Sequence, residues 1–451
     1  MSEDNLAQYL VAVIGAGPAG LFAAKQLSSE GVAVVLLNRD IKPGGLAEYG
    51  IYPDKLKMKD GLRAQFRQIL ASANIHYYGN LIVGNQGDLS LNDLQELGFD
   101  AILVTVGAQG TKWLGLPGED LTGVYHAKDL VYHYNRLPPF SQKQFAIGKR
   151  AAVIGIGNVM TDIAYHLINT LKVDEVIAIG RRGPNESKYE RKELERIVAY
   201  LDMEAYEEEI RRVTPLMISL GQDAQAPLEF IRTTLQKAEP RQSNSRLTLQ
   251  FLASPVCIHG DANGRVSGLE VEDNTLYLSG NTVKARSLGT RRIIPVDTVI
   301  FAIGDRVDDQ FGLPVMNNVF IKCEQPLFPV EGISYEAFDP ASGCPIKGVF
   351  VAGWSRQASA GLVGVARKDG TNGAKAVLQY LKTQAPRSTG LQPFMGRLEQ
   401  IEKPLVRSED LALLELAERS RAERLGLAEF KFSSNEDMLR AIRMAQLTPH
   451  R

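Results

Sequence analysis

Three glycines near the start of the chain have a spacing that could bind phosphate. Gly15, Gly17 and Gly20 lie within residues 14–21, which read Ile-Gly-Ala-Gly-Pro-Ala-Gly-Leu. In such a pattern the first glycine permits a tight turn, the second lets the backbone approach a pyrophosphate, and the third lets a helix pack closely on a strand. The helix that follows offers free N–H groups and the positive end of its dipole to the phosphates. The spacing therefore predicts a dinucleotide site, with Pro18 and Ala19 inside it.

The elements around this turn are those that the chemistry needs. An apolar stretch at residues 9–13 predicts a strand, apolar residues recur at helical spacing from residue 21 to 27, and a second apolar stretch spans residues 32–37. A glycine pattern alone is weak evidence, because turns are rich in glycine. Here strand, turn, helix and second strand follow in order, which favours the dinucleotide site.

A second glycine turn lies more than a hundred residues further on. A predicted strand at residues 150–154 leads into Gly155 and Gly157, followed by Asn158, Val159 and Asp162. The third glycine of the pattern is replaced by Met160, so this turn alone would be a weaker match. Asp162 is either a polar group near a bound coenzyme or a helix-surface residue, and the sequence leaves both open.

Two adjacent arginines follow the next predicted strand, at residues 175–179. At this strand end an NAD site usually carries an acid for the ribose 2′-hydroxyl, whereas an NADP site carries arginine for the 2′-phosphate. Arg181 and Arg182 would present two guanidinium groups to such a phosphate. The alternative is a solvated basic turn. The position favours NADP. A charged amphipathic helix is predicted at residues 188–200, and residues 207–237 show no clear pattern. Residues 246–257 are predicted to form a strand, followed by a hairpin turn at residues 260–265.

Further turns could contact a cofactor or could merely connect elements. They lie around Gly45, Leu46 and Gly50, at Gly107 after a strand at residues 101–106, and at Gly353 and Trp354 after a strand at residues 348–352. A segment of small residues at 358–364 and a predicted helix at 369–381 follow. Such a segment can bring backbone N–H groups to the carbonyl edge of a flavin.

Composition excludes several other classes. The 451 residues allow two or three domains, and 51 Lys and Arg against 52 Asp and Glu give a net charge of −1, which does not suggest nucleic acid as a partner. The acidic, polar N-terminus does not resemble a secretory signal, and no apolar run is long enough to span a bilayer. Three isolated cysteines and six histidines show no metal spacing. We therefore expect structural thiols in a reducing cytoplasm and no metal.

Taken together, these motifs resemble the adrenodoxin-reductase type of ferredoxin–NADP reductase, a two-dinucleotide flavoprotein similar to glutathione reductase. The most specific pieces are residues 155–162, residues 180–184 with 192–194, and Gly353 with Trp354, and the resemblance extends from residue 9 to about residue 441. It implies FAD on the first turn and NADP on the second. It also implies hydride transfer from NADPH to the flavin and single-electron transfer to a ferredoxin, or the reverse, with no protein nucleophile or base.

The resemblance carries over residue by residue. Asn38 stands where the family usually has an acid for the FAD ribose, and residues 359–363 replace the family's Pro-Thr-Gly-Val-Ile segment beside the flavin. The family's basic ferredoxin patch corresponds here to residues 222–244, which hold only scattered basic residues. The implied cofactor-binding residues are Gly15, Gly17, Pro18, Ala19, Gly20, Asn38, Arg39, Gly45, Leu46, Gly50, Gly107, Gly155, Gly157, Asn158, Val159, Asp162, Arg181, Arg182, Glu193, Gly353, Trp354, Gly361, Leu362 and Val363.

The predicted fold is α/β, with two Rossmann-like dinucleotide-binding domains and a helical C-terminal tail. An FAD domain at residues 1–107 and 305–385 would be interrupted by an NADP domain at 108–304, and the tail would span 386–451. Two other functions stay open. The chain could be an NADPH-oxidising subunit of a larger complex, similar to the glutamate synthase small subunit, whose cysteine-rich cluster domain is absent here. It could also be a non-catalytic FAD and NADP sensor, or, less favoured, a two-dinucleotide monooxygenase.

Overall fold

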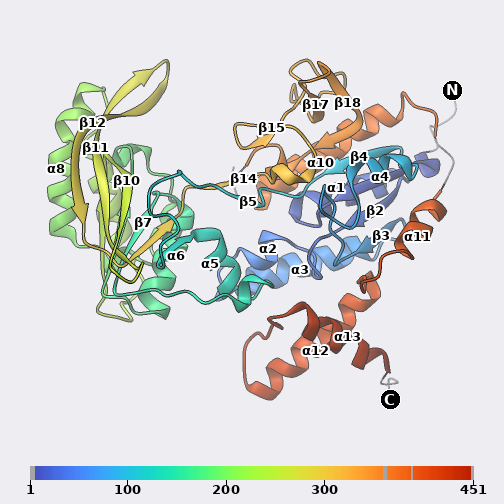
Figure 1. Cartoon of the computed structure of the whole chain (residues 1–451), viewed down its shortest axis with the longest axis horizontal. Coiled ribbons are helices and arrows are strands. Elements are labelled where there is room, and N and C mark those ends of the chain that lie inside the picture. The colour runs from blue at the N-terminus through green and yellow to red at the C-terminus, as the bar shows by residue number, and fades with distance from the viewer. Residues whose placement is uncertain (1–5, 359–362, 387–389, 448–451) are drawn as a thin grey trace. The chain divides into compact units, whose positions relative to one another are not determined.

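The computed structural model describes residues 6–358, 363–386 and 390–447 (Figure 1). The chain divides into two compact units. Unit 1 holds Met1–Thr111, Tyr132–Gln142 and Gly304–Arg451, and unit 2 holds Lys112–Val131 and Lys143–Ile303. Each unit contains its own parallel sheet with helices around it, so the predicted α/β class is confirmed. The assignment of one cofactor to each predicted domain stays a prediction.

Unit 1 is built on a six-stranded sheet in the order β17-β18-β4-β1-β2-β3. All neighbours are parallel except the pair β17–β18, which is antiparallel. The strands are β1 (Leu10–Ile14), β2 (Ala33–Leu37), β3 (Ile75–Tyr78), β4 (Ala101–Val104), β17 (Glu336–Asp339) and β18 (Cys344–Val351). The strand order reverses between β1 and β4, and ligands of such sheets bind at the carboxyl ends of the strands at that point.

Helices cover this sheet because its strands are apolar on both faces, and a separate hydrophobic core lies on each face. The helices of unit 1 before the tail are α1 (Pro18–Ser29), α2 (Leu46–Tyr49), α3 (Leu56–Leu70), α4 (Leu91–Glu96) and α10 (Val363–Leu381). Helices α1 and α10 pack with almost no separation, since a Cβ added to Gly370 would lie 2.1 Å from the carbonyl oxygen of Ala19.

The tail of unit 1 is helical, as expected. It contains α11 (Gln392–Leu398), α12 (Ser408–Leu425) and α13 (Asn435–Leu447), the last two drawn in red in Figure 1. Helices α12 and α13 share a small hydrophobic cluster with Ile41 and Val406. The tail therefore packs against the loop that follows β2. Short two-stranded pairs, β5 (Gly110–Thr111) with β14 (Asp305–Arg306) and β15 (Val315–Met316) with β16 (Val319–Phe320), complete the unit.

Unit 2 is also built on a sheet whose strand order reverses once. Its five parallel strands have the order β6-β13-β7-β8-β9, so the order reverses between β7 and β13. They are β6 (Val124–His126), β7 (Arg150–Ile154), β8 (Glu175–Ile179), β9 (Arg246–Gln250) and β13 (Thr298–Phe301). The helices are α6 (Asn158–Tyr165), continued by a π-helical turn at His166–Thr170, α7 (Arg191–Leu194), α8 (Met203–Ser219) and α9 (Ala226–Leu235). Helix α5 (Ala127–Tyr134) runs from unit 2 into unit 1.

A separate antiparallel sheet of three strands completes unit 2. It consists of β10 (Ala253–Gly260), β11 (Val266–Ser279) and β12 (Thr282–Ile294), in yellow-green in Figure 1. The predicted hairpin turn between β10 and β11 is present, with Asp261 accepting from the backbone N–H groups of Asn263 and Arg265. One face of this sheet carries the buried side chains of Ile258, Leu269 and Val271, which belong to a hydrophobic core. The other face carries partly exposed polar residues.

Two expectations about local structure were wrong, and one segment without a clear pattern is helical. The predicted helix at residues 188–200 is reduced to α7 and a 3₁₀ turn at Val198–Tyr200. Residues 207–237, which showed no pattern, are mostly helical in α8 and α9. The stretch 246–257, which reads as one strand, is two strands, because Leu252 adopts a left-handed conformation with φ +52° where the chain changes sheets.

Candidate functional site

The first glycine turn joins β1 to α1, and two of its glycines are required by the packing of the protein itself. Gly15 has φ +103°, and a Cβ there would lie 2.6 Å from the carbonyl oxygen of Thr105 at the end of β4. A Cβ on Gly20 would lie only 1.9 Å from the carbonyl oxygen of Gly15. Both positions thus exclude any larger residue.

Gly17 differs from these two glycines. Its φ of −75° and ψ of −177° are open to any residue, and a Cβ there would meet nothing within 4 Å. It is the N-cap of α1, which begins with Pro18 and Ala19 and has no side-chain cap. Since neither backbone strain nor protein packing requires a glycine here, close approach by an external group explains it best. The open space beside a helix N-terminus suits a pyrophosphate.

The loop after β2 packs directly against this turn. The N–H of Gly44 donates to the carbonyl oxygen of Ala16 at 2.7 Å. Gly45, the N-cap of α2, has φ +49°, and a Cβ on it would lie 3.1 Å from the Cα of Gly17. Leu46 starts α2, and Gly50 ends it, with its own Cβ position blocked by Leu46. The predicted contact loop is therefore adjacent to the glycine turn.

Asn38 serves the protein rather than standing free for a ligand. It is buried at the end of β2, and its Oδ1 accepts from the N–H of Ala16 at 3.0 Å. Its Nδ2 donates to the carbonyl oxygens of Asp40 and Lys42 at 2.8 and 3.1 Å. The side chain thus ties the glycine turn to the loop after β2. The neighbouring Arg39 is exposed and pairs with Asp40 at 3.1 Å.

The end of β18 is held by groups that the sequence did not single out. The N–H of Gly353, which has φ +66°, donates to Asp369 of α10 at 2.6 Å, and Arg356 donates to both oxygens of this buried carboxylate. Ser355 accepts from the N–H of Gly107 at 2.9 Å, which joins the ends of β4 and β18. Only the apolar pattern of α10, interrupted by an acid, could have indicated Asp369 from sequence.

The remaining predicted residues of the first site have these positions. Trp354 is half-buried within the 3₁₀ turn Gly353–Ser355, and Val363 begins α10. Gly361 and Leu362 lie outside the described residues. Their roles as flavin contacts stay predictions.

A buried charge cluster supports α2 from the side of the tail. The Glu48 carboxylate accepts from Nε and Nη2 of Arg63, each at 2.7 Å, and lies 2.7 Å from Nζ of Lys431 and 3.5 Å from Nζ of Lys42. Although burial opposes ionisation, these cations hold the pKa of Glu48 well below its usual range. Burial lowers the pKa of Lys431 to about 8. The tail residue Glu418 binds Lys42 at 2.6 Å.

The second glycine turn joins β7 to α6 and shows the same division of roles. Gly155 has φ +119°, and its Cβ would lie 2.4 Å from the carbonyl oxygen of Ala302. Gly157, the N-cap of α6, has φ −146° and ψ −175°, and its Cβ would meet nothing within 4 Å. Met160, in place of the third glycine, is fully buried. Val159, by contrast, is 44% exposed, although it is apolar.

Arg181 and Arg182 follow β8, and hydrogen bonds hold the backbone of both residues. The carbonyl oxygen of Arg181 accepts from Nδ2 of Asn274 at 2.9 Å, and that of Arg182 accepts from the N–H of Leu252 at 3.2 Å. Neither guanidinium group makes a hydrogen bond or ion pair with the part of the chain that the structure describes. Arg181 is exposed and Arg182 half-buried. Two cations on a fixed turn without acceptors suit a phosphate dianion.

The segment after the arginines lies beside the glycine turn, which explains why its predicted helix fails. The N–H of Lys188 donates to the carbonyl oxygen of Ile156 at 2.9 Å, and the N–H of Glu190 donates to Oδ1 of Asn158 at 2.7 Å. Residues 188–190 are therefore extended, and α7 begins only at Arg191. The exposed Lys188 thus lies next to the second turn. Sequence reasoning missed this residue, because it read the segment as helix.

The two acidic residues predicted for the second site lie in α6 and α7. Asp162 of α6 pairs with Nη1 of Arg196 at 3.3 Å, and the Arg196 guanidinium lies over the ring of Tyr165. This pairing favours the helix-surface alternative for Asp162. Glu193 is half-buried in α7. A direct coenzyme contact by either residue stays a prediction.

A model of a known protein family matches the N-terminal part of the chain. The model of the family described as pyridine nucleotide-disulphide oxidoreductase matches residues 9–202. This stretch includes both glycine turns and the arginine pair. The three cysteines of the present chain are free.

Several known proteins and solved structures are similar to the chain over most of its length. The NADPH-ferredoxin reductase FprA of Mycobacterium leprae is 28% identical over 82% of this chain and 84% of its own length. The mitochondrial NADPH:adrenodoxin oxidoreductase of Salvelinus fontinalis is 28% identical over 82% and 77%. A structure of Mycobacterium tuberculosis FprA with NADPH matches at 25% identity and a TM-score of 0.77, covering 97% of this chain and 99% of that one. The chain is homologous to FprA and adrenodoxin reductase, as the motifs indicated.

Among the described residues, no helix is long and apolar enough to cross a membrane.

Proposed function

We propose that the chain is an FAD-dependent ferredoxin–NADP⁺ reductase, which oxidises NADPH and passes single electrons to a ferredoxin-like iron–sulfur protein. The observation that carries this proposal is the pair of glycine turns. Each ends a central strand of its own parallel sheet, and each has a middle glycine that the fold itself does not need. One chain with two such turns suits two dinucleotides. Homology to FprA and adrenodoxin reductase supports the choice of reaction.

The residues of unit 1 would hold FAD. The N-terminus of α1 faces the space beside Gly17, where it would receive the pyrophosphate. Asn38 and Gly44 fix the turn, and Asp369 and Ser355 fix the backbone at the ends of β18 and β4. When bound, FAD supplies a ring that accepts a hydride and releases electrons one at a time. The protein contributes position and electrostatics.

The residues of unit 2 would hold NADP. The space beside Gly157 would receive its pyrophosphate, and Arg181 and Arg182 would bind the 2′-phosphate. Hydride transfer between two cofactors needs no protein nucleophile or base, so we assign no catalytic residue. The cytoplasmic location expected from the sequence stays a prediction.

Reduction of a [2Fe–2S] ferredoxin tests the proposal. The holoenzyme with NADPH should reduce the ferredoxin anaerobically, with two ferredoxin molecules reduced per NADPH. A Gly17→Val variant, which should lack FAD, is the control for direct reduction. A flavin that NADPH does not bleach would overturn the proposal and favour the non-catalytic sensor. If the flavin bleaches but no ferredoxin is reduced, the acceptor is of another class.

A further inference from the structure

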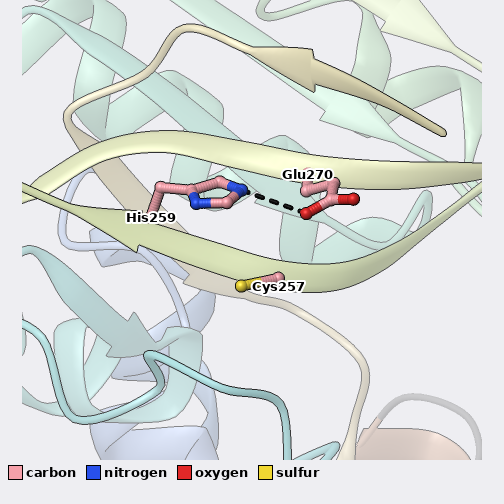
Figure 2. Close-up of side chains that lie close together, drawn as sticks. All are labelled: Cys257, His259 and Glu270. Atoms are coloured by element: carbon pink, nitrogen blue, oxygen red, sulfur yellow. Dashed lines mark hydrogen bonds and ion pairs between the residues drawn. The ribbon is translucent and has the colours of Figure 1, made fainter.

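Three side chains with metal-binding atoms lie together on the antiparallel sheet of unit 2 (Figure 2). Cys257 and His259 come from β10, and Glu270 comes from β11. One potential ligand atom from each lies within 4.8 Å of the other two, and Nε2 of His259 lies 3.0 Å from Oε2 of Glu270. None of these residues belongs to either glycine turn, so the group is independent of the proposed function.

The local fold brings these three residues to one face. Cys257 and His259 are two residues apart on a strand, so their side chains point the same way. A β-bulge between Pro255 and Cys257 adds one residue to β10, and this places Cys257 directly opposite Glu270. Without the bulge, Val256 would occupy that position. Ile258 and Leu269, between the three residues, are buried on the other face.

The position opposite His259 is a glycine. His259 pairs in register with Gly268, and Cγ2 of Ile293 on β12 lies 3.0 Å from the position that a Cβ of this glycine would take. The side chains of His259 and Glu270 are 40% and 20% exposed, and Cys257 is also partly exposed. The group is therefore open to an ion from solvent while its backbone is fixed by the ladder between β10 and β11.

We propose that Cys257, His259 and Glu270 form a zinc site, with water as the fourth ligand. A thiolate, an imidazole and a carboxylate are the donor types that Zn²⁺ takes, and three protein ligands with an open fourth position form a known class of zinc site. Tetrahedral bonds of ~2.0–2.3 Å place donor atoms about 3.3–3.8 Å apart. Small rotations of the three side chains would bring the observed separations to these values.

One neighbouring cation opposes the metal. Nη1 of Arg291, on β12, lies 3.7 Å from Oε1 of Glu270. Its charge would repel Zn²⁺ and compete for the carboxylate. The Arg291→Gln variant should therefore bind zinc several-fold more tightly. A chance group of surface residues that binds no metal would show no such gain.

Calorimetric titration of the holoenzyme with ZnCl₂ tests the proposal. We expect one equivalent to bind, with affinity reduced at least about tenfold in each of Cys257→Ser, His259→Asn and Glu270→Gln. A thermal unfolding midpoint close to that of the wild type shows that each variant is folded, unit 2 included. Cys344→Ser is the matched control, because Cys344 is an exposed thiol of unit 1 and its loss should change nothing. Absence of stoichiometric binding, or unchanged affinity in Cys257→Ser, overturns the proposal.

Thiol alkylation gives a second readout of zinc binding that does not rely on calorimetry. Zinc should protect Cys257 from iodoacetamide, as measured by mass spectrometry of the peptides, while Cys344 in the same sample stays reactive. Equal alkylation of Cys257 with and without zinc also overturns the proposal. Sequence reasoning expected no metal, because the ligands come from two strands and only a bulge aligns them.

Discussion

Gly17 and Gly157 are glycines that the folded protein does not itself require. Their φ and ψ angles suit any residue, and their Cβ positions face open space, whereas Gly15, Gly20 and Gly155 face backbone atoms at 1.9–2.6 Å. The spacing of the motif assigns these two roles by position, and the geometry around each glycine agrees with that assignment. The structure separates them into packing glycines and glycines that leave room for a ligand.

This separation predicts different effects of substitution at neighbouring positions. Gly17→Val should leave the apo protein as stable as the wild type but abolish FAD retention, because the added side chain fills the space for the pyrophosphate. Gly157→Val should keep FAD and lose NADPH binding. Gly20→Ala should instead lower the free energy of unfolding by several kcal/mol, since its Cβ would overlap the Gly15 carbonyl oxygen.

Flavin absorbance and thermal unfolding of the apo forms measure these effects. Apo forms are compared because bound FAD stabilises the protein by mass action. A yellow Gly17→Val variant with normal flavin content would contradict the assignment of FAD to this turn.

Asn38 shows how the structure changes a residue-level interpretation. The family resemblance suggests that an acid would serve better at this position. In the structure the side chain donates two hydrogen bonds to carbonyl oxygens, which a carboxylate cannot do. Asn38→Asp should therefore cost about 1–3 kcal/mol of stability and weaken FAD retention. Urea unfolding and flavin content measure this. Tighter FAD binding in the variant would show that Asn38 contacts the ribose after all.

At the scale of elements, the sequence correctly predicted the strands that flank both glycine turns, but it did not predict several helices in other parts of the chain. The strands next to the glycines are short, fully apolar runs, which are easy to recognise. Helix α8 was missed because it contains Pro215 and many charges. The helix expected at residues 188–200 fails because hydrogen bonds to Ile156 and Asn158 hold its first turn extended. Such contacts between distant segments have no signature in local sequence.

The charge cluster around Glu48 links the helical tail to the loop beside the first turn. Lys431 lies between α12 and α13. Its Nζ pairs with the Glu48 carboxylate at 2.7 Å and donates a hydrogen bond to the Glu48 carbonyl oxygen at 2.9 Å. Burial and the neighbouring Lys42 and Lys59 lower the pKa of Lys431 from 10.5 to about 8. In the unfolded chain the group keeps its ordinary pKa.

The low pKa of Lys431 predicts a dependence of stability on pH. Between pH 8 and 10.5, the folded and the ordinary pKa of this group, the unfolded chain keeps a proton that the folded chain has released. The free energy of unfolding should therefore rise with pH in this window, by at most ~1.4 kcal/mol per pH unit from this group. Lys431→Met should remove that rise. Urea unfolding at several pH values measures it, and parallel profiles for wild type and variant would contradict the shifted pKa.

At the scale of the whole molecule, the chain has almost no net charge and no concentrated basic region at the expected docking segment. Within residues 222–244, Arg232 pairs with Glu207 at 2.8 Å, and Arg241 donates to the carbonyl oxygen of Ser245. Both guanidinium groups therefore already interact with other groups of the protein. Long-range attraction of an acidic partner should accordingly be weak.

The rate of ferredoxin reduction should therefore change only modestly with ionic strength. We expect a change of a few-fold between about 0.01 and 0.15 M salt, since the Debye length falls from ~30 to ~8 Å over this range. Stopped-flow measurement of ferredoxin reduction by the pre-reduced enzyme provides the test. A decrease of a hundredfold would reveal a basic docking surface outside the segment considered.

Anaerobic bleaching of the flavin by NADPH and by NADH tests the central claim most directly. Wild type should bleach with a much higher kcat/KM for NADPH. Alanine at both Arg181 and Arg182 should erase most of this preference through KM, because each lost charge-assisted hydrogen bond costs about 1.5–3 kcal/mol of uniform binding. Arg211→Ala, on an exposed arginine of α8, should keep it. Equal use of both coenzymes by wild type, or an unchanged preference in the double variant, would contradict the account.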